Sequence, residues 1–338
     1  MRFTTNFVFN AVDLPCTFLP GDGQKVLTIL HLFKLISTAK NPRGGIVSDD
    51  MPELPEVETV RRQLQHKVIG RTIASVEVFH DKTVGYDETI EERLTGLTVA
   101  DVNRVGKLLI FSFQEDSDRY LLAHLKMTGQ FFFAEPSGDV LGGGHSMTES
   151  DVRDLPHKHT RVAFHFTDGS TLYFNDLRLF GYTKVVDHAA MELAKKKFGP
   201  EPIEPNFDVE RFVTQIRRRK TPVKAALLDQ SFIAGLGNIY VDEALWRVGV
   251  RPTRRADRLT KREAAALAGA AGAVMNESID VGGTTFQHFS DTGGANGNFT
   301  DYLQVFGQHG TTCRHCGATI KKIRCAGRGT HYCPGCQK

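Results

Sequence analysis

A chain of 338 residues and 37.5 kDa is long enough to form two or three packed domains. Hydrophobic residues make up 41% and charged residues 24%, and no apolar run approaches the roughly 20 residues that span a bilayer, so we expect a soluble globular protein. The net charge of +3 is unevenly placed, because residues 302–338 contain six basic residues and no Asp or Glu. Such a tail is typical of a polyanion-binding surface, although a basic run is more often only a solvated face.

The first 50 residues show neither a clean period nor a targeting signal. They lack the basic front and small-residue cleavage site of a signal peptide, and Asp13 and Asp22 argue against a mitochondrial presequence. We therefore expect residues 1–50 to be an extension outside the functional protein.

Residues 51–65, MPELPEVETVRRQLQ, resemble the beginning of a protein although they lie inside one. Their apolar residues recur at helical spacing, which predicts one amphipathic helix. Pro52 in the first turn, with Glu53 and Glu56, suits an ordinary helix N-terminus as well as it suits a catalytic site. The segment alone leaves both interpretations open.

Short runs rich in β-branched and aromatic residues follow, separated by turn signals such as Asp168-Gly169. Their spacing predicts an antiparallel β-sandwich or barrel. Residues 136–151 are rich in Gly and Ser and are expected to form a flexible loop. The expected strands are residues 72–80, 107–113, 120–125, 130–134, 161–166, 171–174 and 182–187.

A helical region follows a linker at residues 198–208, where FGPEPIEPNFD contains three prolines. Residues 260–279 predict an Ala-rich helix capped by Thr260. A Gly-x-Gly-Asn turn at 235–238 begins another helix. Its glycines would leave backbone N–H groups free to bind a phosphate, and Asn238 would add a side-chain donor. A tight turn between helices without any ligand would use the same glycines. Residues 284–304 are polar and Gly-rich and are expected to form a mobile loop.

Two C-x2-C pairs near the C-terminus are separated by 16 residues. This spacing predicts one structural zinc ion, because two knuckles on a β-hairpin place four thiolates tetrahedrally and the metal contributes folding energy to a small module. Four protein ligands leave no open position for catalysis. The hairpin between the pairs carries Arg324 and Arg328 and could meet phosphates or merely cap the fold. The ligands are Cys313, Cys316, Cys333 and Cys336.

Together, MPELPEVE, the Gly-x-Gly-Asn turn and the terminal zinc ribbon resemble the formamidopyrimidine-DNA glycosylases over residues 51–338. The resemblance implies an α+β multidomain fold. Its expected parts are an N-terminal antiparallel β-sandwich with an N-terminal helix (51–187), a helix-two-turn-helix domain with a damage-recognition loop (188–305) and a zinc ribbon (306–338).

In that family the initiator Met is removed and the N-terminal proline is the nucleophile, so the resemblance implies that Met51 is the functional start and Pro52 the nucleophile. A terminal amine titrates near roughly 8 and is partly unprotonated at neutral pH, and a secondary amine can displace a base from deoxyribose to form an iminium. Glu53 is expected to protonate the opening sugar, and Glu56 to orient the amine or a water.

By the same resemblance, Lys107 would assist β-elimination and Arg328 would promote δ-elimination. A base that leaves the helical stack must be replaced, and Met127 with Arg178 and Phe180 would fill the gap. Leu179 stands where many relatives have a basic residue, which puts one phosphate or opposite-base contact in doubt. The other expected DNA contacts are His159, Arg178, Lys220 and Asn238.

We therefore expect a bifunctional DNA glycosylase and abasic-site lyase that excises oxidised purines, such as 8-oxoguanine and formamidopyrimidines, from duplex DNA. It would act as a monomer in the bacterial cytoplasm, with zinc as its one cofactor. A glycosylase for oxidised pyrimidines, a DNA-binding protein without chemistry and an RNA-binding zinc ribbon are the alternatives. Base selectivity is expected to lie in the loop at residues 284–302.

The extension creates a conflict with this chemistry, because Pro52 inside a longer chain is an amide without a nucleophilic lone pair. Either translation starts at Met51, or a protease generates the Pro52 terminus, or this copy is inactive. The first is the most economical interpretation.

Overall fold

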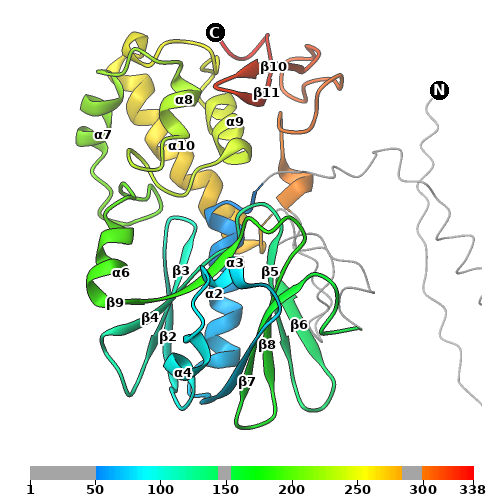
Figure 1. Ribbon diagram of the computed structural model, residues 1–338. Helices are drawn as coiled ribbons and strands as arrows, with labels where there is room; N and C mark the ends of the chain where they lie inside the picture. Colours follow the sequence, from blue (N-terminus) through cyan, green and yellow to red (C-terminus); the bar gives the residue numbers. More distant parts are fainter. Residues whose placement is uncertain (1–50, 144–153, 284–298) are drawn as a thin grey trace, which may run out of the picture. The chain divides into compact units, whose positions relative to one another are not determined.

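The computed structural model describes residues 51–143, 154–283 and 299–338 (Figure 1). These residues belong to one compact unit, Ser48–Lys338. Within them, no helix is both long enough and apolar enough to cross a membrane.

Two antiparallel sheets follow the helix α2 (Leu54–Val68). The five-stranded sheet has the order β1-β7-β8-β5-β6, and the four-stranded sheet has the order β2-β3-β4-β9. The strands are β1 (Ile73–Val78), β2 (Val99–Val105), β3 (Leu108–Phe113), β4 (Arg119–His124), β5 (Gly129–Ala134), β6 (Val140–Gly143), β7 (Thr160–Phe166), β8 (Thr171–Asp176) and β9 (Tyr182–Asp187).

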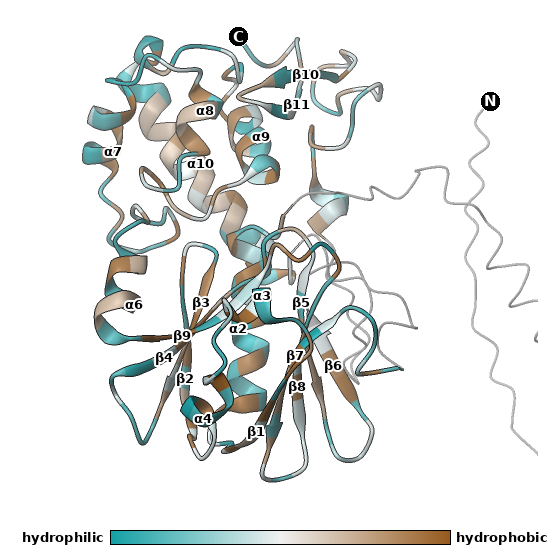
Figure 2. Cartoon of the chain, in the orientation of Figure 1, coloured by the Kyte–Doolittle hydropathy of each residue, from teal (hydrophilic) through white to brown (hydrophobic). Residues whose placement is uncertain are grey.

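The sheets share one apolar core, to which α2 contributes its apolar face. Phe111 of β3 and Phe131 of β5, on different sheets, approach with ring centroids 6.0 Å apart. Figure 2 shows hydrophobic residues along the strands and hydrophilic residues in most of the turns between them. The predicted β-sandwich is confirmed.

The helical region has a second core. Its longest helix begins at the predicted cap, since the Thr260 hydroxyl accepts the Glu263 N–H and the Glu263 carboxylate accepts the Thr260 N–H. The helices after α2 are α3 (Asp81–Val84), α4 (Ile90–Leu94), α6 (His188–Lys195), α7 (Val209–Ile216), α8 (Val223–Leu227), α9 (Asn238–Arg247) and α10 (Lys261–Asp280).

The C-terminal ribbon is a hairpin of β10 (Lys321–Cys325) and β11 (Arg328–Tyr332). Its two-residue turn has positive φ at both positions, 52° at Ala326 and 72° at Gly327. This geometry matches the twist of a hairpin and places Arg328 directly after the tip.

Two strands correct the sequence prediction. The strand β2 escaped it because a bulge after Val99 and three polar residues disturb the alternation. The strand β6 lies inside residues 136–151, which were expected to be a flexible loop. A Cβ at Gly142 would lie 2.5 Å from the Phe132 ring, so the glycine permits close pairing with β5.

The expected mobile loop at 284–304 is also partly wrong. Phe299–Tyr302 form a 3-10 helix, and Phe299 is buried in the helical core. Residues 284–298 and 144–151 lie outside the described residues, so the predictions made for them stand as they were.

Candidate active site

The start of α2 is joined to the start of α9 through Glu53. Its carboxylate accepts N–H groups of Gly237 at 2.7 Å and Ile239 at 2.8 Å, with Tyr240 N at 3.4 Å. The N-terminal end of a helix attracts an anion, and here the anion is a side chain of the same protein. The expectation that these N–H groups stay free for a phosphate is therefore wrong.

Both glycines of the Gly-x-Gly-Asn turn are required because they pack closely against Glu53 and Leu54 at the start of α2. A Cβ at Gly237 would lie 2.3 Å from the Glu53 Cδ, and one at Gly235 would lie 2.3 Å from the Leu54 Cδ1. Leu54 belongs to the helical core, whereas Val57 and the later apolar residues of α2 belong to the sandwich core. The first turn of α2 thus lies where the two cores meet.

Glu56 is buried beside Glu53. One of its carboxylate oxygens accepts the Glu53 backbone N–H at 2.9 Å, and the other accepts the hydroxyl of Tyr240. That hydroxyl also lies 2.6 Å from Ser278 Oγ. Burial, reinforced by the negative charge of Glu56, raises the pKa of Tyr240 well above its ordinary value, so the hydroxyl remains a donor.

Lys107 lies in the tight turn between β2 and β3 and is 3% exposed. Burial lowers the pKa of its ammonium group; the carboxylates of Glu53 and Glu56 oppose this effect, whereas Arg328 and Lys126 reinforce it. Lys107 is thus within electrostatic reach of Glu53 and Glu56 and also of Arg328 at the hairpin tip of the ribbon. Pro52, which precedes the acid pair, is buried as well.

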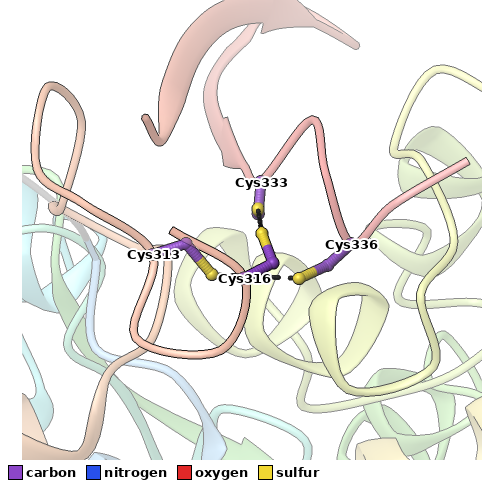
Figure 3. A group of neighbouring side chains, drawn as sticks. All are labelled: Cys313, Cys316, Cys333 and Cys336. Atoms are coloured by element: carbon purple, nitrogen blue, oxygen red, sulfur yellow. Dashed lines mark hydrogen bonds between the residues drawn. The ribbon is translucent and has the colours of Figure 1, made fainter. Parts of the chain in front are cut away.

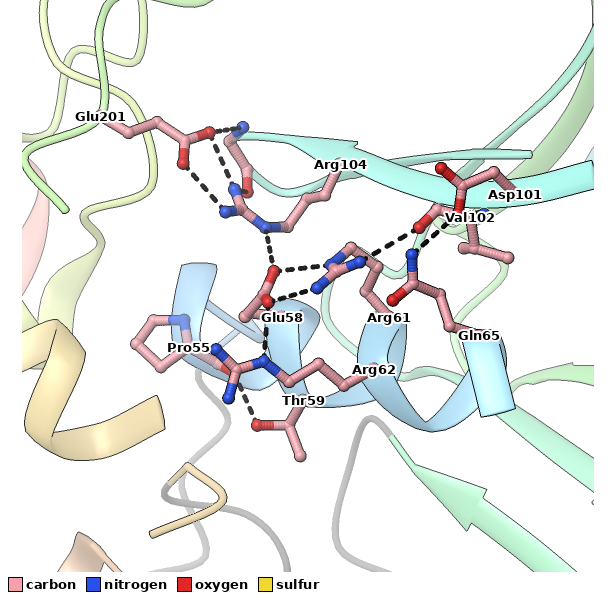
Figure 4. A network of polar contacts seen from close by, with 11 residues as sticks. Pro55, Glu58, Thr59, Arg61, Arg62, Gln65, Asp101, Val102, Arg104 and Glu201 are labelled. Carbon is pink, nitrogen blue, oxygen red and sulfur yellow. Dashed lines mark hydrogen bonds and ion pairs between the residues drawn. The ribbon is translucent and has the colours of Figure 1, made fainter. Parts of the chain in front are cut away.

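A polar network supports the turn at Lys107 (Figure 4). The Arg104 guanidinium donates to both carboxylate oxygens of Glu201, at 2.8 and 2.9 Å, and to Glu58 at 3.1 Å. Glu201 also accepts the N–H of Gly106 at 2.6 Å. Sequence reasoning missed these residues and treated Glu201 only as part of a proline-rich linker. An acid beside two prolines gave no signal that it is buried.

The expected gap-filling residues lie on two loops that meet at Asp176. This buried carboxylate accepts the Thr128 hydroxyl and the N–H groups of Arg178 at 3.1 Å and Gly181 at 2.7 Å. Thr128 follows Met127 directly, so the two loops are joined there. The Arg178 guanidinium lies 5.2 Å from the centroid of the Phe180 ring, which is 49% exposed.

Leu179 has a positive φ of 56°, which a leucine rarely adopts. The residue is half-buried between exposed Arg178 and Phe180. This left-handed backbone lies between Arg178 and Gly181, whose N–H groups the Asp176 carboxylate accepts.

The remaining expected DNA contacts lie apart. The His159 carbonyl accepts the Asp176 N–H at 2.9 Å, so His159 adjoins the same loop. Lys220 is exposed before α8, and Asn238 begins α9. Sequence reasoning missed Lys224, whose ammonium group is fully buried and donates to Asn238 Oδ1 at 2.6 Å. A lysine within the apolar stretch PVKAALL was the available signal.

The four cysteines converge at the base of the ribbon (Figure 3). Their sulfur atoms all lie within 4.8 Å of one another. Tetrahedral zinc with Zn–S bonds of about 2.3 Å needs sulfur atoms roughly 3.8 Å apart, so the donors fit this metal. One structural zinc, held by Cys313, Cys316, Cys333 and Cys336, agrees with the predicted site.

Comparisons with known proteins cover the same regions. Residues 51–183 match the formamidopyrimidine-DNA glycosylase N-terminal domain, residues 198–290 its H2TH domain, and residues 310–338 a zinc finger found in FPG and IleRS. The formamidopyrimidine-DNA glycosylase of Streptococcus pneumoniae (TIGR4) is 39% identical over 291 residues, covering 85% of this chain and 99% of its own length. That of Exiguobacterium sp. (AT1b) is 43% identical over 295 residues, covering 85% and 100%.

Solved structures of the Lactococcus lactis Fpg are also similar. The complex with abasic-site DNA has a TM-score of 0.74 at 35% identity and covers 85% of this chain and 99% of that chain. The complex with Fapy-dG DNA has a TM-score of 0.72 at 35% identity and covers 85% and 100%.

These matches define the chain as a DNA-repair glycosylase by class. The chain belongs to the formamidopyrimidine-DNA glycosylase family. The expectation of a DNA-formamidopyrimidine glycosylase and abasic-site lyase is confirmed at the level of the family.

Proposed function

We propose that this chain excises oxidised purines, namely 8-oxoguanine and formamidopyrimidines, from duplex DNA and then cleaves the strand through a Schiff base on Pro52. The observation that carries the proposal is the convergence of Glu53, Glu56 and buried Lys107 on the segment that begins with Pro52. The Lactococcus lactis relative with its Fapy-dG and abasic-site DNA complexes supports the substrate class.

The working form would begin at Pro52, since only a terminal proline has a basic nitrogen. The lone pair forms a bond to C1′ while the C1′–N glycosidic bond breaks, and the base leaves with the bonding electrons and takes up a proton. The attached nitrogen gives up its proton, which the departing base can take up, and its lone pair then opens the C1′–O4′ bond as O4′ receives a proton from Glu53, which leaves an iminium at C1′. The match of relatives from residue 51 onward supports this start.

The iminium makes the C2′ proton acidic, and its removal expels the 3′ phosphate by breaking the C3′–O bond. Lys107 is suited to assist, because its lowered pKa increases the neutral fraction that can accept a proton. A second elimination, with proton loss from C4′, breaks the C5′–O bond, and Arg328 would stabilise the departing phosphate. Water then hydrolyses the imine and restores the amine.

The DNA contacts are part of the same proposal. Met127, Arg178 and Phe180 would fill the space of the extruded base, and His159, Lys220 and Asn238 would bind the backbone. A monomer in the cytoplasm, bound to duplex DNA, is the proposed state. The domain limits at residues 187 and 305 remain predictions.

Borohydride trapping tests this function. The full chain, a form starting at Met51 and its Pro52→Gly variant are mixed with an 8-oxoguanine duplex and reduced, after intact mass has fixed each N-terminus. The proposal expects covalent adduct from the Met51-start form and none from Pro52→Gly. Absence of adduct from both the full chain and the Met51-start form would leave a zinc-ribbon DNA-binding protein without chemistry. Excision of thymine glycol in preference to 8-oxoguanine would move the substrate to oxidised pyrimidines.

A further inference from the structure

A buried ion pair joins the helical region to the ribbon. Lys224 of α8 and Asp242 of α9 are both fully buried, and the Lys224 Nζ lies 2.7 Å from the Asp242 Oδ1. An ammonium group has three donors, and three acceptors meet them: Asp242 Oδ1, Asn238 Oδ1 at 2.6 Å and the Gly329 carbonyl at 3.3 Å. The pair is therefore satisfied within the protein.

Both charges also contact the backbone of β11. Lys224 donates to the Gly329 carbonyl, and the Asp242 Oδ2 accepts the His331 N–H at 2.7 Å. In a two-stranded sheet, alternate residues turn their backbone groups away from the partner strand. The ion pair thus occupies the outer edge of β11, where a third strand would otherwise pair.

This edge contact lies next to the functional tip. Arg328 directly precedes Gly329 and closes the turn opposite Cys325. Arg328 is exposed, so its own side chain gives the tip little packing to fix its position.

Other contacts hold different parts of the ribbon. The backbone of Lys338 pairs with that of Gly249 and Arg251, and Glu243 accepts the N–H groups of residues 304–306. These contacts anchor the beginning and the end of the ribbon. The Lys224–Asp242 pair contacts β11, the strand that begins at Arg328, whereas on β10 the Cys325 thiol donates to the Pro252 carbonyl at 3.7 Å.

We propose that Lys224 and Asp242 are positioning residues that fix the register of β11 and thereby aim Arg328 at the reacting sugar. A buried ion pair contributes little net stability because desolvation of its charges offsets their attraction, whereas it can specify register. The inference rests on the proposed function, since Arg328 is assigned there to the second elimination. Lys224 also fixes the orientation of the Asn238 amide by binding its oxygen.

The test uses the double variant Lys224→Met/Asp242→Ala, which removes both contacts to β11 without leaving one buried charge unpaired. Leu267→Ala is the matched control, because it removes as many side-chain atoms as Asp242→Ala from the buried helical core. Both variants are made in the full chain and in the Met51-start form. On an abasic-site duplex, β-elimination leaves an unsaturated aldehyde and δ-elimination a 3′ phosphate, so gel mobility gives their ratio.

We expect the δ-to-β product ratio of the double variant to fall on the order of tenfold, while borohydride adduct still forms and Leu267→Ala keeps the original ratio. Because the ratio is taken among products, a change in DNA affinity cancels. An unchanged ratio in the double variant, or an equal fall in Leu267→Ala, would overturn the inference.

Hydrogen exchange at the His331 amide separates this inference from the proposed function. The double variant should exchange this amide about tenfold faster than the wild type, with Leu267→Ala as the control for general destabilisation. This readout needs no catalysis. If the wild type traps no DNA, the proposed function fails, and retained protection of His331 in the double variant would independently refute the register role.

Discussion

Tyr240 controls the hydrogen bonding of the acid pair at the residue scale. Its hydroxyl donates to Glu56 and meets Ser278, and its raised pKa keeps the proton in place at alkaline pH. Glu56 in turn accepts the backbone N–H of Glu53. One phenol therefore orients the Glu56 carboxylate, which binds the backbone of Glu53.

Replacement of Tyr240 by Phe should slow 8-oxoguanine excision roughly tenfold to a hundredfold, because a hydrogen bond to a charged group contributes about 1.5–3 kcal/mol. Single-turnover excision kinetics of the Met51-start form measure the effect. Tyr86→Phe is the control, since Tyr86 is 71% exposed. Equal rates for Tyr240→Phe and the wild type would show that the phenol does not orient Glu56 for the reaction.

Glu58 gives a second prediction at this scale. Burial alone would raise the pKa of Glu58, but hydrogen bonds from Arg61 and the charge of Arg104 outweigh it and lower the pKa from 4.5 to about 2. A lowered pKa in the folded state stabilises the protein above the unfolded value and loses that effect as pH falls from 4.5 toward 2.

The free energy of unfolding of the wild type should therefore decrease more steeply with acidification than that of Glu58→Gln. Urea unfolding of both proteins across this pH window gives the difference. Parallel pH profiles would contradict the assigned role of the arginines.

The helix α2 shows the coupling between elements, because it takes part in two cores. Leu54 packs in the helical core and Leu64 in the sandwich core, and the two residues are 0% and 4% exposed. The segment between Pro52 and Glu56 is positioned by both.

Leu54→Ala and Leu64→Ala should each lower the free energy of unfolding by about 2–5 kcal/mol. Only Leu54→Ala should also reduce the trapping rate, since it loosens the segment that carries the acids against α9. Thermal unfolding and borohydride trapping of both variants, measured at a temperature where each is folded, test this. A trapping loss of the same size in Leu64→Ala would mean that stability, and not position, determines the rate.

Local patterns predicted the helix and strand types well where a single face is buried. The Thr260 cap predicted the start of α10, and the short β-branched and aromatic runs predicted the sandwich. The strand β6 was missed because the role of Gly142 becomes clear only from Phe132 on the neighbouring strand. Such a contact between strands has no local signature.

The residues of the candidate site also differ in how far the sequence could predict them. Pro52, Glu53 and the four zinc ligands stand in short motifs, so sequence could single them out. Glu201 and Asp242 could not be recognised, because each charge is balanced by a partner at another place in the sequence, Arg104 at a separation of 97 residues and Lys224 at a separation of 18. Lys224 itself gave a signal only through its position in an apolar stretch. Burial of a charge is a property of the folded chain.

The whole molecule combines three regions at one place. The sandwich supplies Lys107, the helical region supplies the N-terminus of α9, and the ribbon supplies Arg328. The acid-free segment from residue 302 onward gives the ribbon its positive charge, and the zinc site stabilises the hairpin that presents it. The proposed chemistry depends on one bond, between the Pro52 nitrogen and the sugar.

The most direct measurement is peptide mapping by tandem mass spectrometry of the borohydride-reduced adduct with an 8-oxoguanine duplex. The account predicts the reduced sugar remnant on the N-terminal nitrogen of Pro52 in protein that begins at that residue. Attachment to Lys107 or another lysine, with Pro52 unmodified, would contradict it.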